Sequence, residues 1–374
     1  MNTNNIDNMN INFSEIAQNL TDKLDEALKN LPPINMIIAG KSGVGKSTLI
    51  NAMFRDELAE TGTGFPVTSR IRKYTKRDVP LTIYDTPGLE LTSDQQIKVK
   101  QEIMEIIDDS SIDKKTQIHC IMYCINSLSE RIEPAEIEWI KELSKTDIPI
   151  IIVLTKVNAP KKAERLKRVI EGENLKAQCV SVLAKDDDDY DPPIKSHGLD
   201  RLLELLCLAI PEELYTTLNN VQIISVSEKQ KAARQVVWKY CVGAGICGVA
   251  PIPFSDFLAL IPTQLTMLVH ITIIFGLDIN KSKLLLLITS TLGCGSSTMI
   301  GKAFFSNLLK LIPGAGTIAG GAVSAGTAAL VTGALGEAYI QLLSKFIQGE
   351  INELGAKQFN DLYMKQLRIE MNKQ

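Results

Sequence analysis

The spacing of hydrophobic residues changes twice along the chain. Near the N-terminus the apolar residues recur at helical spacing: Phe13, Ile16, Leu20, Leu24, Leu28 and Leu31. Pro32-Pro33 ends this run. We therefore predict an amphipathic helix within residues 1–33. Because its polar face is acidic rather than basic, packing on its own protein is favoured over contact with a membrane.

Short, continuous apolar runs follow, as is typical of strands that are buried on both faces of a sheet. These runs are Ile34–Ala39, Leu81–Tyr84, Ile118–Ile125, Pro149–Leu154 and Gln178–Leu183. Helix-like segments separate most of them: Lys46–Phe54, Ser93–Ile107, Pro134–Ser144 and Leu199–Ala209. Arg70–Lys76 alternates weakly and is a candidate edge strand. The alternation predicts an α/β domain over residues 34–212, with a mostly parallel sheet and helices on both faces.

Residues 213–374 have a different pattern, which predicts an all-α, hydrophobic domain. Leu214–Tyr240 is expected to be one long, partly charged helix, and Glu337–Gln374 an amphipathic one. Between them, Tyr240–Gln348 contains only eight charged residues, whereas 22% of the whole chain is charged. Three stretches carry no charge and are long enough to span a bilayer: Phe257–Leu277, Leu284–Gly301 and Leu311–Gly336.

Two interpretations of these stretches remain open. Pro262, Gln264 and His270 interrupt the first stretch, and the third consists mostly of small residues. Helices with small residues, such as the Gly316 and Gly320 pair, pack closely in lipid, but the same pattern describes a tight soluble hairpin. The residues alone favour membrane association, spanning or inserted, over a buried soluble core.

Net charge and the absence of targeting signals limit the classes of binding partner and the cellular compartments that we expect. The net charge is −3 and there is no basic domain, which argues against DNA and against RNA as partners. Residues 1–12 lack the charged-then-apolar order of a signal peptide, and the cysteines show no disulfide or zinc spacing. We expect a cytoplasmic protein, or one at the cytoplasmic face of a membrane.

The first candidate chemistry follows the first apolar run directly. Residues 40–47 fit the pattern GxxxxGK[ST]: Gly40, Lys41, Ser42, Gly43, Val44, Gly45, Lys46 and Ser47. In such a loop the glycines let backbone N–H groups curl around phosphate oxygens, and the next helix points its positive end at the same anion. The lysine neutralises phosphate charge and the serine hydroxyl binds Mg²⁺.

Three further loops lie at the ends of later strands, in the order that nucleotide binding requires. Asp85-Thr86-Pro87-Gly88 offers a carboxylate for Mg²⁺ and a backbone N–H for a γ-phosphate. Thr155-Lys156-Val157-Asn158 is placed where a base-recognition loop belongs, and Ser181-Val182-Leu183-Ala184 ends the last strand. The acidic run Asp186–Asp189 beyond it is interpreted as a solvated loop rather than a metal site.

Together these motifs resemble translation-factor-class GTPases of the Era-like group, over residues 34–210. The resemblance implies a site for GTP or GDP with Mg²⁺, in which Lys46, Thr68 and Gly88 act in catalysis. It also implies that Ser47, Thr68 and Asp85 hold the metal, with Thr61 and Thr63 as competing candidates for the part given to Thr68. The implied nucleotide contacts are Gly40, Lys41, Ser42, Gly43, Val44, Gly45, Lys46, Ser47, Thr48, Asp85, Gly88, Thr155, Lys156, Asn158, Ser181, Val182 and Leu183.

Two positions depart from that family. Leu89 follows the DTPG motif where a water-orienting Gln stands in Ras-type enzymes, and Gly43 replaces the Asn that binds an activating potassium ion in some relatives. Slow intrinsic turnover is therefore expected. Asn158 replaces the family's Asp, so one edge of guanine is poorly matched, and Asn158 could instead suit xanthine. GTP remains favoured because Lys156 and the layout match.

The C-terminal part resembles the hydrophobic domain of unknown function that accompanies some Era-like GTPases, on Ala250–Asp256 and on the Gly/Ala-rich segment after Pro313. The architecture is more distantly similar to immunity-related GTPases. We expect a nucleotide-controlled switch that engages a membrane or assembles with itself. The alternatives are a membrane-shaping structural module with little turnover and an RNA- or ribosome-associated GTPase.

Overall fold

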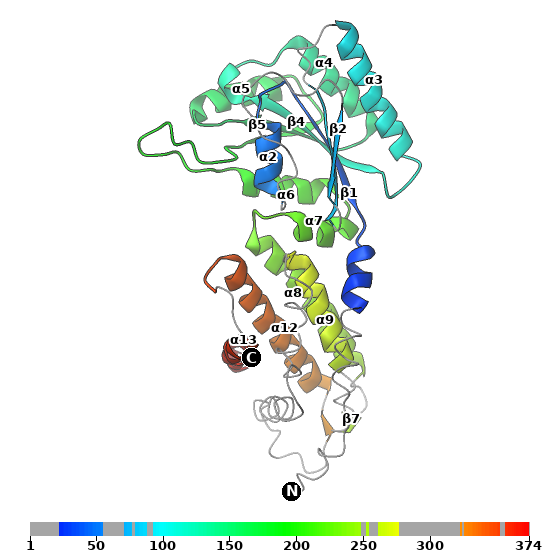
Figure 1. Ribbon diagram of the computed structural model, residues 1–374, viewed down its shortest axis with the longest axis vertical. Coiled ribbons are helices and arrows are strands. Elements are labelled where there is room, and N and C mark those ends of the chain that lie inside the picture. The colour runs from blue at the N-terminus through cyan, green and yellow to red at the C-terminus, as the bar shows by residue number, and fades with distance from the viewer. Residues whose placement is uncertain are drawn as a thin grey trace. The chain divides into compact units, whose positions relative to one another are not determined.

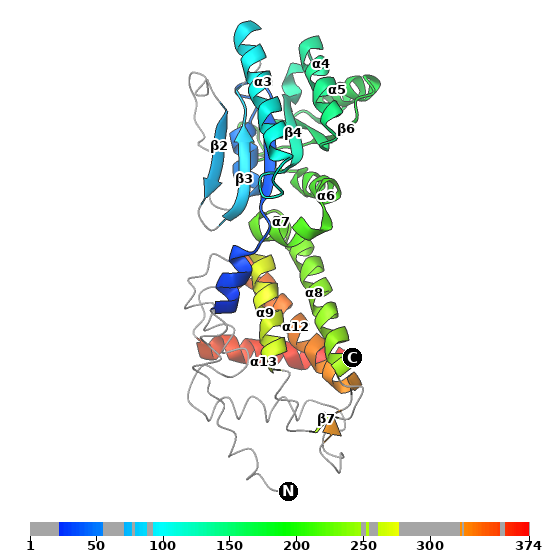
Figure 2. The same cartoon turned by 90° about the vertical axis from the view of Figure 1, so that its right-hand side faces the viewer.

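The computed structural model describes residues 22–54, 71–76, 79–87, 93–247, 252–253, 261–276, 322–323, 325–351 and 356–373. The chain divides into two compact units. One runs from Leu31 to Ser225, and the other combines the residues up to Asn30 with Val226–Gln374. Figures 1 and 2 label the elements of both units.

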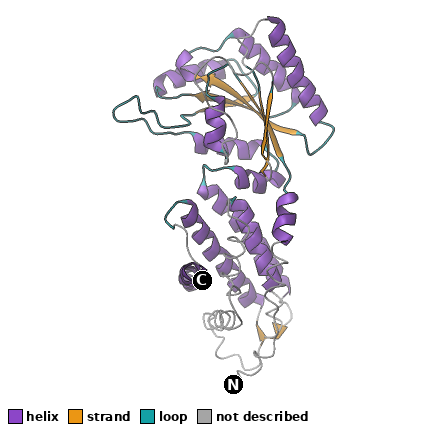
Figure 3. Ribbon diagram, viewed as in Figure 1, coloured by secondary structure: helices purple, strands orange, loops and turns teal. Residues whose placement is uncertain are grey.

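A six-stranded sheet forms the centre of the first unit (Figure 3). In chain order its strands are β1 (Ile34–Ala39), β2 (Arg72–Lys76), β3 (Val79–Asp85), β4 (Ile118–Asn126), β5 (Ile150–Thr155) and β6 (Ala177–Ser181). Their order across the sheet is β2-β3-β1-β4-β5-β6, and only the edge strand β2 is antiparallel to its neighbour. The predicted fold class, including the added edge strand, is confirmed.

Helices cover both faces of this sheet, as the continuous apolar strands require. One apolar core packs strand residues such as Met36 against α2 (Lys46–Met53), α6 (Leu199–Ala209) and α7 (Tyr215–Val221). The other packs strand residues such as Ile37 against the remaining helices, which are α3 (Ser93–Ser110), α4 (Pro134–Leu143) and α5 (Pro160–Gly172). Short 3₁₀ turns occupy Ser127–Ser129, Ser144–Thr146 and Glu212–Leu214. Helix α5 was not predicted from the sequence, because only three of its residues are buried and the rest are largely charged.

The helix predicted over Leu214–Tyr240 is wrong as a single element. The chain forms α7, leaves the helical path at Gln222, and begins α8 (Val226–Cys247) four residues later. Here Ile223 N–H donates to the Met53 carbonyl (3.0 Å), and Gln222 forms an isolated bridge with Phe54. These backbone bonds to the end of α2 compensate for the interrupted helix, which helical periodicity alone could not reveal.

The second unit is helical. Residues 22–29 form a helix, followed by α8, α9 (Ile261–Phe275), α12 (Ala325–Ile347) and α13 (Ala356–Lys373). A two-stranded sheet pairs β7 (Ile252–Pro253) with β8 (Ala322–Val323). The amphipathic helix predicted over Glu337–Gln374 is likewise two helices, since α12 ends at Ile347 and Gly349 has a left-handed φ of 73°. The predicted Gly316 and Gly320 contact lies outside the described residues.

Helices α8 and α12 lie side by side in antiparallel directions. Gln230 of α8 donates to the Ser344 hydroxyl (2.8 Å), and further along α8, Arg234 binds both carboxylate oxygens of Glu337 (2.7 and 2.9 Å). Polar groups also pair inside the bundle, where the Thr272 and Tyr339 hydroxyls lie 2.8 Å apart. Within the described ranges, no helix combines the length and the apolar character needed to cross a bilayer.

Candidate nucleotide-binding site

The loop between β1 and α2 has the backbone shape that phosphate binding requires. Gly40 has a φ of 132°, and a Cβ there would lie 2.2 Å from the Cys124 carbonyl oxygen of β4. Only glycine therefore fits where the loop leaves the sheet. Gly45 is the N-cap of α2 with a φ of 104°, and no side chain caps the helix. The first N–H groups of α2 are left to attract an anion.

Lys46 and Asp85 meet beside this loop. The buried Lys46 ammonium group donates to the carbonyl oxygens of Gly40 (2.9 Å) and Lys41 (3.2 Å), so the side chain folds back over the loop. Asp85 ends β3, next to Ile38 of β1, and its Oδ1 lies 4.0 Å from the Lys46 Nζ. That oxygen is buried and accepts no hydrogen bond from any residue that the structure describes. Burial raises the pKa of Asp85.

Charged and polar neighbours oppose that rise in the Asp85 pKa. They are Lys46, Arg72 and the Tyr74 hydroxyl. A buried carboxylate oxygen without a donor is costly unless something binds it, and oxygen is the ligand that Mg²⁺ prefers. Ser47 is the second residue of α2 and Thr48 the third, at the same helix end. The residues present therefore fit a Mg²⁺-bound phosphate group.

A contact that the sequence did not predict holds the loop from the other side. The Lys41 ammonium lies 2.7 Å from Glu133 and 3.3 Å from Glu136, which is buried. Burial lowers the pKa of Lys41, but the two carboxylates outweigh it and the net shift is upward. Glu133 and Glu136 form the capping box of α4. The helix start at Pro134 was predicted from the sequence, but nothing local linked Glu133 or Glu136 to Lys41.

The predicted base-recognition loop lies at the end of β5 and contacts the phosphate loop. The Thr155 hydroxyl donates to the Val44 carbonyl (2.5 Å), which joins the two loops directly. Lys156 has a left-handed φ of 54°, and its Cε lies 3.9 Å from where a Cβ on Gly45 would stand. The lysine stem thus runs along the phosphate loop. Ser127 donates to the Lys156 carbonyl and supports this turn (3.1 Å).

The loop after β6 is tied to the same region by backbone bonds. Val182 N–H donates to Leu154 (2.8 Å), and Val157 N–H donates to the Val182 carbonyl (3.2 Å). Ser181 ends β6, and Leu183 pairs with His197. The structure thus brings together the predicted residues within 40–48, 155–158 and 181–183 with Asp85. Thr68 and Gly88 lie outside the described residues, as do Thr61, Thr63 and Leu89.

Comparison with known proteins agrees with this geometry. Residues 35–156 match the family model described as 50S ribosome-binding GTPase, and residues 216–368 match a domain of unknown function, DUF697. The first unit has the P-loop GTPase fold. The finer resemblances to the Era-like group and to immunity-related GTPases stay predictions.

Among curated proteins the chain is similar to septins. It is 29% identical to Septin-9 of Rattus norvegicus over 168 residues, which cover 38% of this chain and 29% of that protein. It is 25% identical to human Septin-12 over 207 residues, which cover 47% of this chain and 57% of that protein. The chain therefore spans less than two thirds of these relatives.

Two solved structures are also similar to this chain. A probable GTP-binding protein engB is 20% identical, with 49% of this chain and 98% of that chain covered and a TM-score of 0.34. A single-residue variant of Aquifex aeolicus Era bound to GDP.AlF4⁻ is 19% identical, with 56% and 67% covered and a TM-score of 0.34.

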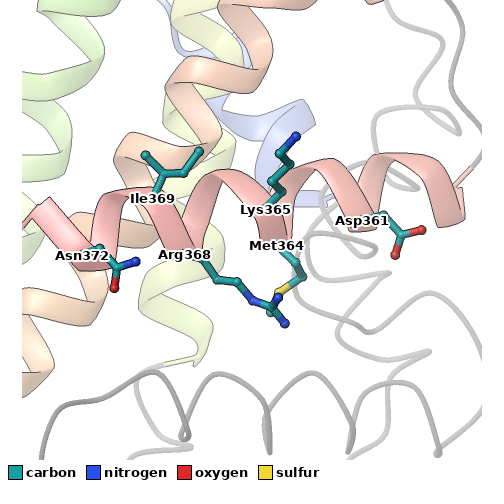
Figure 4. Close-up of a pocket in the computed structure, with 6 residues that line it drawn as sticks. All are labelled: Asp361, Met364, Lys365, Arg368, Ile369 and Asn372. Carbon is teal, nitrogen blue, oxygen red and sulfur yellow. The ribbon is translucent and has the colours of Figure 1, made fainter.

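A separate pocket of about 370 Å³ lies along one face of α13 in the helical unit (Figure 4). Four polar or charged residues and two apolar ones line it: Asp361, Met364, Lys365, Arg368, Ile369 and Asn372. None of these residues is among the predicted nucleotide contacts.

Proposed function

We propose that this chain is a GTP-binding protein and a Mg²⁺-dependent GTPase that acts as a nucleotide-controlled switch. The observation that carries the proposal is the meeting of Lys46 with a buried Asp85 oxygen, which accepts no hydrogen bond from the described residues, beside the uncapped N-terminus of α2. A cation, a metal-binding oxygen and free N–H groups at one place suit a bound polyphosphate.

At the phosphate end of the site, side chains of this protein would neutralise the phosphate charge and orient the phosphates. The Lys46 ammonium would exchange its two loop carbonyl partners for phosphate oxygens, a small movement for a flexible side chain. Ser47 and Asp85 would hold Mg²⁺, which when bound neutralises charge on the phosphates. The ion pairs between Lys41 and the start of α4 keep the loop in place while this exchange occurs.

At the base end, Lys156 and Asn158 follow β5, and the loop of Ser181, Val182 and Leu183 follows β6. Ligands of open α/β sheets bind at the carboxyl ends of the strands, where these loops gather. Thr155 bonds to the phosphate loop, and backbone bonds join the loop after β5 to the loop after β6, which supports a base subsite next to the phosphate subsite.

Hydrolysis is expected to be slow in the isolated protein. Leu89 cannot orient a water molecule, and Gly43 offers no side chain for an activating cation. A partner or a second copy would then complete the reaction, which is why we propose a switch at a membrane or in a self-assembly. Turnover that rises steeply with protein concentration or with liposomes would support this extension, and flat, negligible turnover would favour a structural module.

The central test is nucleotide affinity in Lys46→Ala and Ser47→Ala, measured with fluorescent GTP in the presence of Mg²⁺. Both should lose binding by about a hundredfold or more, because each loses a charge-assisted contact to phosphate or metal. Lys161→Ala is the matched control, since that lysine is exposed on α5. Tight GTP binding by both Lys46→Ala and Ser47→Ala would refute the assignment.

A further inference from the structure

A carboxylate from a distant loop holds the side chain of Asn158. The Asn158 Nδ2 donates to Asp187 Oδ2 at 2.9 Å, although 29 positions separate the two residues. The other amide atom, Asn158 Oδ1, is buried and has no hydrogen-bond partner among the described residues. A buried acceptor left unpaired costs about 1–3 kcal/mol, so this oxygen requires a donor that the described part of the chain does not supply.

The partner also decides which way the amide faces. A carboxylate accepts hydrogen bonds and cannot donate one, so Asp187 pairs only with the NH₂ end of the Asn158 amide. Rotating the amide by half a turn would place two acceptor oxygens against each other. Asp187 therefore keeps Oδ1, which can accept but not donate a hydrogen bond, on the side of the Asn158 amide that faces away from Asp187.

Asp187 itself is held in place by the loop that carries it. Its N–H donates to the Ile194 carbonyl (2.8 Å) and its carbonyl accepts from Ile194 N–H (3.0 Å). Further along this hairpin, the His197 Nε2–H donates to the carbonyl of Val157, the residue before Asn158 (3.0 Å). The hairpin is thus fastened to the base-recognition loop at two points. Asp188 and Asp189 are exposed, as expected for a solvated acidic loop, whereas Asp187 is half-buried.

Purine bases differ at the edge that such an acceptor would meet. Guanine presents two donors there, N1–H and the exocyclic NH₂, whereas xanthine presents N1–H beside a carbonyl oxygen. A carbonyl oxygen has two lone pairs and can accept from both guanine donors. An amide free to rotate would turn its NH₂ toward the xanthine oxygen, and the preference would be lost.

We propose that Asp187 is a positioning residue that makes the base subsite prefer guanine to xanthine, by holding the Asn158 NH₂ away from the base. The inference rests on the proposed nucleotide-binding function and assigns its base selectivity. Asn158 and Asp187 together then do what a single aspartate would do at this position.

The test is the ratio of GTP to XTP affinity, measured by competition against fluorescent GTP, for the full chain and for Asp187→Ala. We expect Asp187→Ala to lower this ratio about tenfold, mainly through a gain in XTP affinity, which equals about 1.4 kcal/mol. Asp188→Ala, a neighbouring exposed carboxylate, is the control and should leave the ratio unchanged.

In a second pair of variants, we expect the effect of Asp187→Ala on GTP affinity to change sign. Asn158→Asp places two carboxylates at the 2.9 Å contact, and like charges at that distance repel. In that background Asp187→Ala should raise GTP affinity, whereas in the native background it should not. A role confined to stabilising the hairpin would produce no such reversal.

The possible results distinguish a failure of the inference about Asp187 from a failure of the proposed nucleotide-binding function. An unchanged GTP to XTP ratio in Asp187→Ala, with GTP still bound, overturns the inference and leaves the proposed function standing. Equal losses for both nucleotides also overturn it, because that result indicates a structural tie only. If the unmodified chain binds neither nucleotide, the proposed function fails and the inference fails with it.

Discussion

Substitution of Gly336 by alanine tests how closely α8 and α12 pack. A Cβ on Gly336 would lie 2.4 Å from Val237 Cγ2 and 2.9 Å from Cγ1, far below the 3.5–4.0 Å of ordinary carbon contacts. Because Val237 Cβ is also only 3.2 Å away, rotating the valine cannot clear the space. The helices must therefore shift apart or strain.

The magnitude follows from two opposing effects. Overpacking a well-packed interface costs about 1–3 kcal/mol, while replacing a helical glycine by alanine gains about 0.8–1.0 kcal/mol. The net expectation for Gly336→Ala is a loss of about 0–2 kcal/mol in the free energy of unfolding. Val237→Ala removes two methyl groups from a buried side chain and should cost about 2–3 kcal/mol by itself.

The double variant, Gly336→Ala with Val237→Ala, tests directly whether these two positions clash. With Val237 shortened, the new methyl group at Gly336 has room, so the two losses should fall short of additivity by about 1–3 kcal/mol. Gly243→Ala on α8 is the matched control, because among the described residues no atom outside the backbone of α8 lies within 4 Å of its Cβ position. It should stabilise the chain by about 0.5–1 kcal/mol.

Urea unfolding followed by far-UV circular dichroism measures these differences in the free energy of unfolding. Binding of fluorescent GTP to the same samples checks that the first unit, Leu31–Ser225, is intact. The reasoning is refuted if Gly336→Ala is as stable as Gly243→Ala, or if the double variant is simply additive. Either result would mean that α8 and α12 do not approach as closely as their glycine contact indicates.

Two further predictions concern buried titratable side chains. Burial lowers the pKa of His119 from 6.5, and its Nδ1 accepts from Asn35 N–H (3.2 Å), so the folded state resists protonation there. Stability should therefore fall as pH drops below about 6.5, by at most about 1.4 kcal/mol per pH unit, and less steeply in His119→Asn, which keeps an acceptor. Equal pH slopes in urea titrations from about pH 7 to 5 would contradict this. Lys229, which is buried, donates to the Phe275 carbonyl at the end of α9 (3.0 Å), so Lys229→Met should cost about 1.5–3 kcal/mol. Lys231→Met, which removes an exposed cation from the same helix, should cost under about 1 kcal/mol. Equal losses of stability in Lys229→Met and Lys231→Met would show that the Lys229 bond to the end of α9 does not stabilise the protein.

Short-range patterns in the sequence were sufficient to predict most elements of the first unit, Leu31–Ser225. Ile34–Ala39 and Leu199–Ala209 were predicted with the bounds that the structure has, because continuous apolar runs and helical periodicity follow directly from burial. The phosphate loop was equally accessible, since its glycines, lysine and serine lie within eight consecutive residues. Chemistry that depends on local spacing can be recognised without knowing the fold.

Contacts between distant segments could be decided only by the tertiary structure. Hydrophobic periodicity does not indicate the helix break at Gln222, which is stabilised by backbone bonds to the end of α2. Lys41 meets Glu133 far along the chain, and Asp187 reaches Asn158 only because β5 and β6 are neighbours in the sheet. The sequence by itself determined which residue types stand at each strand end, because periodicity and motif spacing are local. Which of them touch, and hence which way the Asn158 amide faces, was decided by the order of the strands.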